Sequence, residues 1–199
     1  MPARQPCDTN CILLRKTPFQ ESSLVIAAIT AGYGRVDFLL KGARTVGKRK
    51  FPEAELFREF HMIFREAKNA DGLASIIECE PVAQHDAIAE KTEHYMAACS
   101  CAAFYLKNTK PMLPVPESYQ AFRTMLLRME KEKETEPWAS LARYVLLNEN
   151  GFVPASPQAD RLLKLALDPD MIPPEDHNSF WNRFKNWIDN LCLWSGIEK

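Results

Sequence analysis

The spacing of apolar residues changes near Pro81, and this change constrains the fold more than any other feature of the sequence. Before it, apolar and polar side chains alternate over short runs, as they do in half-buried β-strands. After it, apolar residues recur every three or four positions, as they do on one face of an α-helix. The sequence therefore predicts two domains, one of strands at residues 1–80 and one of helices at residues 81–199.

Five short runs in the first domain have the composition and alternation of strands. They cover residues 11–15, 23–30, 35–41, 56–65 and 73–80. Five strands are too few for an immunoglobulin-type sandwich, but they suit a small closed barrel, of which the five-stranded oligonucleotide-binding (OB) fold is the commonest type. The expected fold class is therefore α+β, with an N-terminal OB-fold β-barrel followed by an α-helical bundle.

Helical periodicity in the second domain is expected at residues 84–107, 117–133, 137–148, 157–167 and 177–194. Ser156 and Pro157 fit the N-cap and first position of the fourth helix. The aromatic stripe of the last helix, which includes Phe184 and Trp187, is interpreted as core. The alternating charges of residues 129–136 are interpreted as a solvated helix face.

Positive charge is concentrated in residues 35–50, although the whole chain has a formal net charge of −1. Six cations stand there against the single acid Asp37. Cations on a glycine-containing loop suit the neutralisation of phosphates without reading base sequence. We therefore expect DNA to bind at Arg35, Lys41, Arg44, Lys48, Arg49 and Lys50. The alternative is a solvated loop that only keeps the protein in solution.

No catalytic motif or metal site is recognisable in the sequence. A nucleophile elbow, a phosphate-binding glycine loop and a zinc-protease helix motif are all missing, and the six cysteines form no C-x-x-C pair. We therefore expect a protein that is not an enzyme, needs no cofactor or metal, and keeps its cysteines as free thiols. No apolar run approaches the ~20 residues of a membrane-spanning helix, so we expect no membrane contact and a cytoplasmic location.

Three short motifs of the first domain resemble those of one family in their order and spacing. They read TPFQESS at residues 17–23, TAGYGR at residues 30–35 and KGAR at residues 41–44. Together they resemble RecO, the bacterial recombination mediator of single-strand gap repair, and the second domain has a similar LL…GFVP passage ending at residue 154. Many RecO proteins then carry a four-cysteine zinc module. Here Ala155 leads directly to the fourth helix, so the chain resembles a short member without zinc.

The resemblance implies what the protein does and what it binds. It implies binding of single- and double-stranded DNA, annealing of complementary strands and help in loading recombinase during DNA repair, in association with the nucleoid. It also implies two protein partners, RecR and the acidic, hydrophobic C-terminal tail of single-strand-binding protein.

Such a tail requires an apolar groove between helices with cations at its rim. The candidates are cations beside the apolar stripes of the second domain, namely Arg123, Arg143, Arg161 and Lys164. Ordinary surface ion pairs with the acids of this domain are the alternative for each of them.

The residues leave a second class of function open, an OB-fold protein-interaction scaffold with weak or no nucleic-acid binding. Residues 1–80 contain 12 basic and 10 acidic side chains, a net charge of only +2. A salt-dependent DNA-binding assay would separate the two functions.

Overall fold

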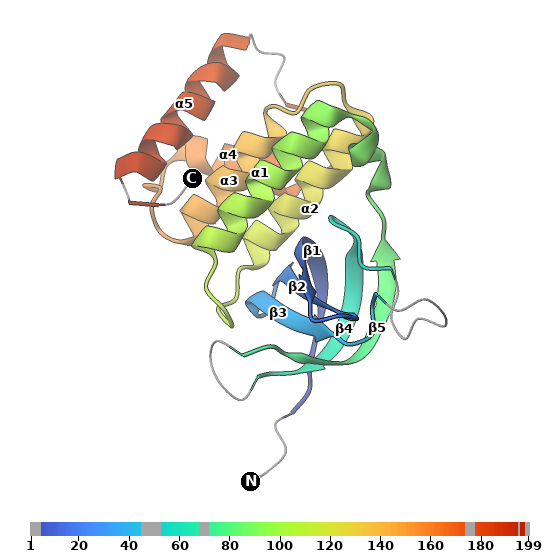
Figure 1. The fold of residues 1–199 in the computed structure, drawn as a ribbon. Coiled ribbons are helices and arrows are strands. Elements are labelled where there is room, and N and C mark those ends of the chain that lie inside the picture. Colours follow the sequence, from blue (N-terminus) through green and yellow to red (C-terminus); the bar gives the residue numbers. More distant parts are fainter. Residues whose placement is uncertain (1–4, 45–52, 68–71, 174–177, 195, 198–199) are drawn as a thin grey trace. The chain divides into compact units, whose positions relative to one another are not determined.

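The chain forms two compact units, which are connected by more than one crossing of the chain. The computed structural model describes residues 5–44, 53–67, 72–173, 178–194 and 196–197 (Figure 1). Unit 1 contains Met1–Asp86 and Thr109–Pro114, and unit 2 contains Ala87–Asn108 and Val115–Lys199. In the described residues, no helix has both the length and the apolar character needed to cross a membrane.

Unit 1 is built on one five-stranded antiparallel sheet. Its strands are β1 (Cys7–Phe19), β2 (Ser23–Thr30), β3 (Gly34–Leu40), β4 (Glu59–Arg65) and β5 (Ser75–Ala83). Their order across the sheet is β3-β2-β1-β4-β5. Three of the four strand pairs are therefore formed by neighbours in sequence, and only β1 and β4 come together from a distance. The five predicted strands are confirmed.

β1 is longer than the sequence predicts because it pairs with two different strands. Residues 7–12 pair with β4, and residues 11–19 pair with β2. An irregularity between Leu13 and Arg15 lies where the strand leaves one partner and continues along the other, and such a bulge bends a strand. Only the buried middle of β1 has an apolar run, so the prediction of residues 11–15 found that part alone.

The two edge strands of the sheet meet at Ala74. The Ala74 amide donates to the Asp37 carbonyl oxygen at 2.8 Å, and the Leu39 amide donates to the Ala74 carbonyl oxygen at 3.4 Å. The bridge between Phe38 and Ala74 is parallel. The sheet thus curls until its edges touch, although it is not closed along its length. This arrangement is that of a partly open OB-type barrel. The predicted OB-type fold is confirmed, whereas the predicted closure of the sheet is incomplete.

The barrel core is formed by the inward-facing residues of alternating strands. Along β3, Val36, Phe38 and Leu40 are buried while the residues between them are half-buried. The Phe38 and Phe64 rings pack edge to face with centroids 5.2 Å apart. Tyr33 packs edge to face against Phe64 at 5.5 Å. The alternation read from the sequence therefore identified the buried face correctly.

Gly34 allows another part of the chain to pack closely on the start of β3. Its φ of +59° is in the left-handed region, and a Cβ at this position would lie 2.2 Å from the Leu113 carbonyl oxygen and 2.7 Å from that of Lys110. No side chain fits at that separation. The close packing explains why Thr109–Pro114 belongs to unit 1.

In the described residues, unit 2 contains five α-helices, as predicted. They are α1 (Thr92–Asn108), α2 (Pro116–Lys131), α3 (Trp138–Glu149), α4 (Pro157–Leu167) and α5 (Asn178–Trp194). The first helix was predicted to begin at residue 84, but a 3₁₀ helix, Asp86–Glu90, precedes it. The predicted N-cap of α4 is confirmed, because the Ser156 hydroxyl accepts a hydrogen bond from the Ala159 amide at 3.1 Å.

α3 is the central helix of unit 2 and contacts α1, α2, α4 and α5. Trp138, Leu141 and Tyr144 on this helix are each 1% exposed. The Tyr105 hydroxyl of α1 lies 2.8 Å from the Ala142 carbonyl oxygen and 3.1 Å from that of Ser118 on α2. The buried hydroxyl therefore joins three helices with its hydrogen-bonding capacity satisfied.

Residues 129–136 are only partly the solvated face that the sequence predicted. Lys131, Lys133 and Glu134 are exposed, whereas Glu132 is half-buried. The Glu132 carboxylate accepts hydrogen bonds from Arg128 Nη1 at 2.9 Å and from the indole nitrogen of Trp138 at 2.6 Å. The Arg128 guanidinium also lies over the Trp138 ring, 4.5 Å from its centroid. The sequence pattern did not show the structural role of Glu132, because its indole partner, Trp138, belongs to the next helix.

Candidate nucleic-acid and partner-binding surfaces

The cations predicted to bind DNA begin at the end of β3. Arg35, Lys41 and Arg44 lie in the described part of the chain, whereas Lys48, Arg49 and Lys50 lie outside the described residues. Lys41 and Arg44 are exposed on the turn that follows β3. Neither Lys41 nor Arg15, which is exposed on β1, forms an ion pair with another described residue. Both are available to an anionic ligand.

Arg35 differs from these residues because its charge is already compensated. Its Nη2 lies 2.7 Å from Asp37 Oδ2, and the two residues share one face of β3. The Arg35 side chain is 26% exposed. Because the pair is close to neutral, we expect Arg35 to contribute less to phosphate binding than Lys41.

Arg44 connects the loop after β3 to the β1–β2 turn. Its amide donates to the Ser22 carbonyl oxygen at 2.9 Å, and its Nη1 donates to the Gln20 carbonyl oxygen at 3.3 Å. Gln20 has a φ of +52°, which is uncommon for a residue with a side chain. The two bonds to Arg44 hold this turn in place.

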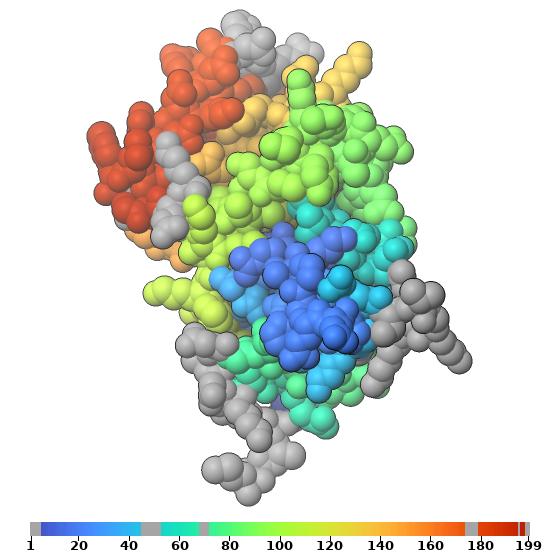
Figure 2. All heavy atoms as spheres, viewed as in Figure 1, coloured from blue at the N-terminus to red at the C-terminus, as the bar shows by residue number. Residues whose placement is uncertain are grey.

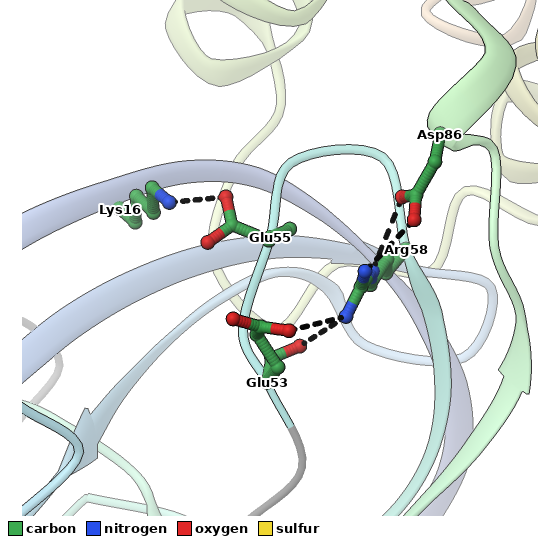
Figure 3. A network of polar contacts seen from close by, with 5 residues as sticks. All are labelled: Lys16, Glu53, Glu55, Arg58 and Asp86. Carbon is green, nitrogen blue, oxygen red and sulfur yellow. Dashed lines mark hydrogen bonds and ion pairs between the residues drawn. The ribbon is translucent and has the colours of Figure 1, made fainter. Parts of the chain in front are cut away.

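Two further cations of the barrel, Lys16 and Arg58, have carboxylate partners (Figure 3). Arg58 lies 2.8 Å from Asp86 and 3.6 Å from Glu53, and Lys16 pairs with Glu55. The hydrogen bond from Arg58 lowers the pKa of the Asp86 carboxyl. These pairs balance the charge of Lys16 and Arg58, so the uncompensated positive charge of the described barrel is concentrated at fewer residues than the composition suggests.

Unit 2 contains an apolar groove of about 870 Å³ between α4 and α5. Its walls are mostly aromatic and aliphatic, and they include Tyr144, Leu162, Leu165, Phe180, Phe184 and Trp187. The Phe180 and Phe184 rings are stacked with an interplanar angle of 6°. Ile172, also in the lining, is 80% exposed, so part of this apolar surface faces solvent.

Three cations line the groove. Arg161 and Lys164 come from α4, where a spacing of three residues places them on one face. Arg183 comes from α5. The structure therefore brings two of the four predicted partner-binding residues to one site and adds a third cation that the sequence did not identify.

The other two predicted residues do not line this groove. Arg143 Nη2 lies 3.0 Å from Asp189 Oδ1, and its guanidinium lies 4.9 Å from the centroid of the Phe104 ring. Its side chain is only 16% exposed. Arg123 lies on α2 and is half-buried. These positions favour structural roles for both residues.

The aromatic stripe of α5 is divided between the core and the groove. Phe184, Ile188 and Cys192 are buried at successive intervals of four residues, as expected for the helix face that packs inward. Trp187, which was interpreted as core, is 40% exposed and lines the groove. The sequence analysis did not select Arg183, because it assigned the neighbouring aromatic residues of α5 to the core and expected no groove there.

The cysteines are free thiols in the structure. Burial raises the pKa of Cys79 to about 11 and that of Cys101 to about 12, so both thiols are protonated at neutral pH and are poor nucleophiles. Among the described residues, no group of three His, Cys, Asp or Glu side chains could hold a metal ion.

Comparison with known proteins identifies the family of the barrel. The family model described as "Recombination protein O N terminal" matches residues 5–85. No curated protein matches the chain. The matched region covers β1 to β5 and contains the three motifs at residues 17–23, 30–35 and 41–44. Residues 5–85 are therefore an N-terminal domain of the recombination protein O (RecO) family.

Proposed function

We propose that this protein is a DNA-binding recombination mediator without catalytic activity. In this role it binds single- and double-stranded DNA, anneals complementary strands and assists recombinase loading. Its RecO N-terminal domain supports a role in DNA recombination and repair. The proposed place of action is the cytoplasm, at the nucleoid.

One observation carries the DNA-binding proposal, the exposed positive charge at one end of an OB-type barrel. Lys41 and Arg44 are exposed there, at the start of a segment that continues to Lys48, Arg49 and Lys50. OB folds bind oligonucleotides through one curved face and its loops. Cations on such a loop neutralise phosphates irrespective of base sequence, and an annealing protein requires this property.

A salt titration of oligonucleotide binding tests the proposal. Lys41→Gln with Arg44→Gln removes two positive charges, and each phosphate contact on a single strand contributes about 0.7 to the slope of log K against log salt. We expect the slope to become less steep by about 1.4. If the two proteins bind equally at ~1 M salt, this change corresponds to a loss of affinity of about 25-fold at ~100 mM salt. Lys131→Gln with Lys133→Gln removes the same charge from exposed positions of unit 2 and is the matched control. Equal binding by the two double variants would contradict the proposal.

We further propose that the groove between α4 and α5 binds the C-terminal tail of single-strand-binding protein, and that RecR is a second partner. The tail combines acidic residues with terminal apolar ones. The groove offers the complement, with aromatic walls for the apolar residues and Arg161, Lys164 and Arg183 for the acids. The RecR proposal rests on membership of the RecO family alone.

Binding of a labelled peptide with aspartates before its apolar C-terminal residues tests the groove. Arg161→Glu with Lys164→Glu should weaken this peptide several-fold and leave oligonucleotide binding unchanged, because the altered residues lie in unit 2. Lys131→Glu with Lys133→Glu reverses the same number of charges outside the groove lining. A tail peptide that binds the two variants equally would remove this half of the mechanism.

The alternative function is a protein-interaction scaffold with weak or no nucleic-acid binding. The pairing of Arg35, Lys16 and Arg58 with carboxylates favours it, because it reduces the positive charge available to DNA. The same salt titration separates the two functions. A scaffold would bind oligonucleotides weakly, with a slope that does not depend on Lys41 or Arg44.

A further inference from the structure

An exposed aromatic ring lies at the end of the barrel that carries Lys41 and Arg44. Phe19 is the last residue of β1 and is 39% exposed. It is not part of the barrel core, whereas Tyr33 packs against that core. Arg15, Thr17 and Phe19 alternate along the exposed end of β1, so they share one face of the strand. In Figure 2 the surface of the N-terminal strands (blue) is uncovered on the visible face.

Strand pairing places this ring at the same end of the sheet as the cationic loop. Phe19 pairs with Ser23 on β2, and Leu24 on β2 pairs with Leu40 on β3. The ring and the loop beginning at Lys41 are thus carried by the ends of β1 and β3, with one strand between them.

The backbone turn that follows Phe19 is held by the contacts of Arg44. Phe19 precedes Gln20, whose carbonyl oxygen accepts a hydrogen bond from Arg44, and the Arg44 amide bonds Ser22 in the same turn. Ordering a loop on binding costs conformational entropy, and a turn that is already held reduces that cost.

We propose that Phe19 is a base-stacking residue for single-stranded nucleic acid. One unpaired base stacks on the ring while Lys41, Arg44 and Arg15 contact the neighbouring phosphates. This inference rests on the proposed DNA-binding function and adds a preference for single strands to it. Proteins that bind single strands combine aromatic rings with cations in this way, and bases in a duplex are already stacked on one another.

Two substitutions at Phe19 distinguish stacking on an aromatic ring from a general contribution of an apolar side chain. Phe19→Leu keeps an apolar side chain but removes the ring, and Phe19→Trp keeps an aromatic face. Stacking of one base on one ring is worth a factor of about 5 to 150 in affinity. We expect Phe19→Leu to weaken binding of a labelled oligothymidylate by at least about 5-fold, with an unchanged salt slope because the ring has no charge. Binding of a duplex of equal length and the melting temperature should not change.

Phe19→Trp supplies a direct signal of stacking. The four natural tryptophans are Trp138, Trp181, Trp187 and Trp194, and all lie in unit 2. A tryptophan at position 19 would therefore be the only one in unit 1. We expect oligothymidylate to quench the added fluorescence of this variant, with an affinity equal to that of the parent protein or higher.

The outcomes distinguish this inference from the function on which it rests. If the parent protein binds no oligothymidylate at ~100 mM salt, the proposed DNA binding fails and the inference fails with it. If the parent binds but Phe19→Leu binds equally well, or Phe19→Trp shows no quenching at saturation, the stacking role is overturned and DNA binding stands. An equal loss of single-strand and duplex binding with a lower melting temperature would assign Phe19 a structural role and also overturn the inference.

Discussion

Glu149 provides the N-terminal cap of α2 from the end of α3, and its removal should destabilise unit 2. Its Oε1 accepts a hydrogen bond from the Glu117 amide at 3.1 Å, and its Oε2 accepts from the Ser118 amide at 2.8 Å and from the Ser118 hydroxyl at 2.5 Å. The α2 N-cap residue, Val115, offers no side-chain cap. The first free amides of α2 therefore depend on a carboxylate from another helix.

The size of the effect follows from the burial of these donors. Ser118 is 0% exposed, so its amide and hydroxyl depend on the Glu149 carboxylate for an acceptor, whereas the half-buried Glu117 amide is less enclosed. A buried donor left without its acceptor costs about 1–3 kcal/mol. With two such donors, Glu149→Ala should lower the free energy of unfolding by about 3 kcal/mol. Glu149→Gln keeps one acceptor oxygen and should cost about half as much.

Urea denaturation followed by tryptophan fluorescence measures this effect in the correct part of the molecule, since all four tryptophans lie in unit 2. For a protein of this size, about 3 kcal/mol corresponds to a fall in melting temperature of about 6–12 °C. Glu134→Ala makes the same substitution at an exposed loop position and should change little. A loss below about 1 kcal/mol for Glu149→Ala would refute the capping role.

Three further predictions concern charge and metal. The first is a triple variant, Lys48→Glu with Arg49→Glu and Lys50→Glu, which should weaken binding of unrelated oligonucleotides about equally and make the salt slope less steep in the titration described above. Unchanged affinity at ~100 mM salt would argue against DNA binding by this segment. The second follows from the lowered pKa of the Asp86 carboxyl. Its pair with Arg58 stabilises the fold at pH values above the ordinary aspartate pKa, and this stabilisation is lost as the pH falls through the lowered pKa. The stability difference between the parent and Arg58→Gln should therefore narrow on acidification towards pH 3 in urea denaturation, and a constant difference would contradict this. Purified protein should contain no stoichiometric zinc by metal analysis, and a chelator should leave its melting temperature unchanged; about one zinc per chain would overturn this expectation.

The features that could be predicted from the sequence are those that depend on neighbouring residues. β2 was predicted at its observed bounds because its β-branched run and flanking turns are local signals. The α4 N-cap was predicted because Ser156 and the amide that it accepts are three residues apart. The order of strands followed by helices needed only the change in periodicity near Pro81.

The features that could not be predicted depend on partners far along the chain. The N-terminal part of β1 pairs with β4, more than 40 residues away, and its pattern alone does not indicate a strand. Glu149 caps a helix whose first residues precede it by about 30 positions. Arg183 joins Arg161 and Lys164 only once α5 lies beside α4. The periodicity of α5 shows which residues lie on its apolar face, but the position of the neighbouring helix determines which of them line a groove.

The return of the chain to unit 1 at Thr109–Pro114 has a consequence for modularity. A cut after residue 86 does not yield two independent modules, because a fragment beginning at residue 87 carries six residues whose packing partner, the start of β3 at Gly34, is left behind. The barrel fragment in turn loses the segment that covers Gly34. A chimaera that takes one unit from a relative would therefore need matched residues at Gly34 and in Thr109–Pro114. We expect substitutions at these two places to be coupled in evolution.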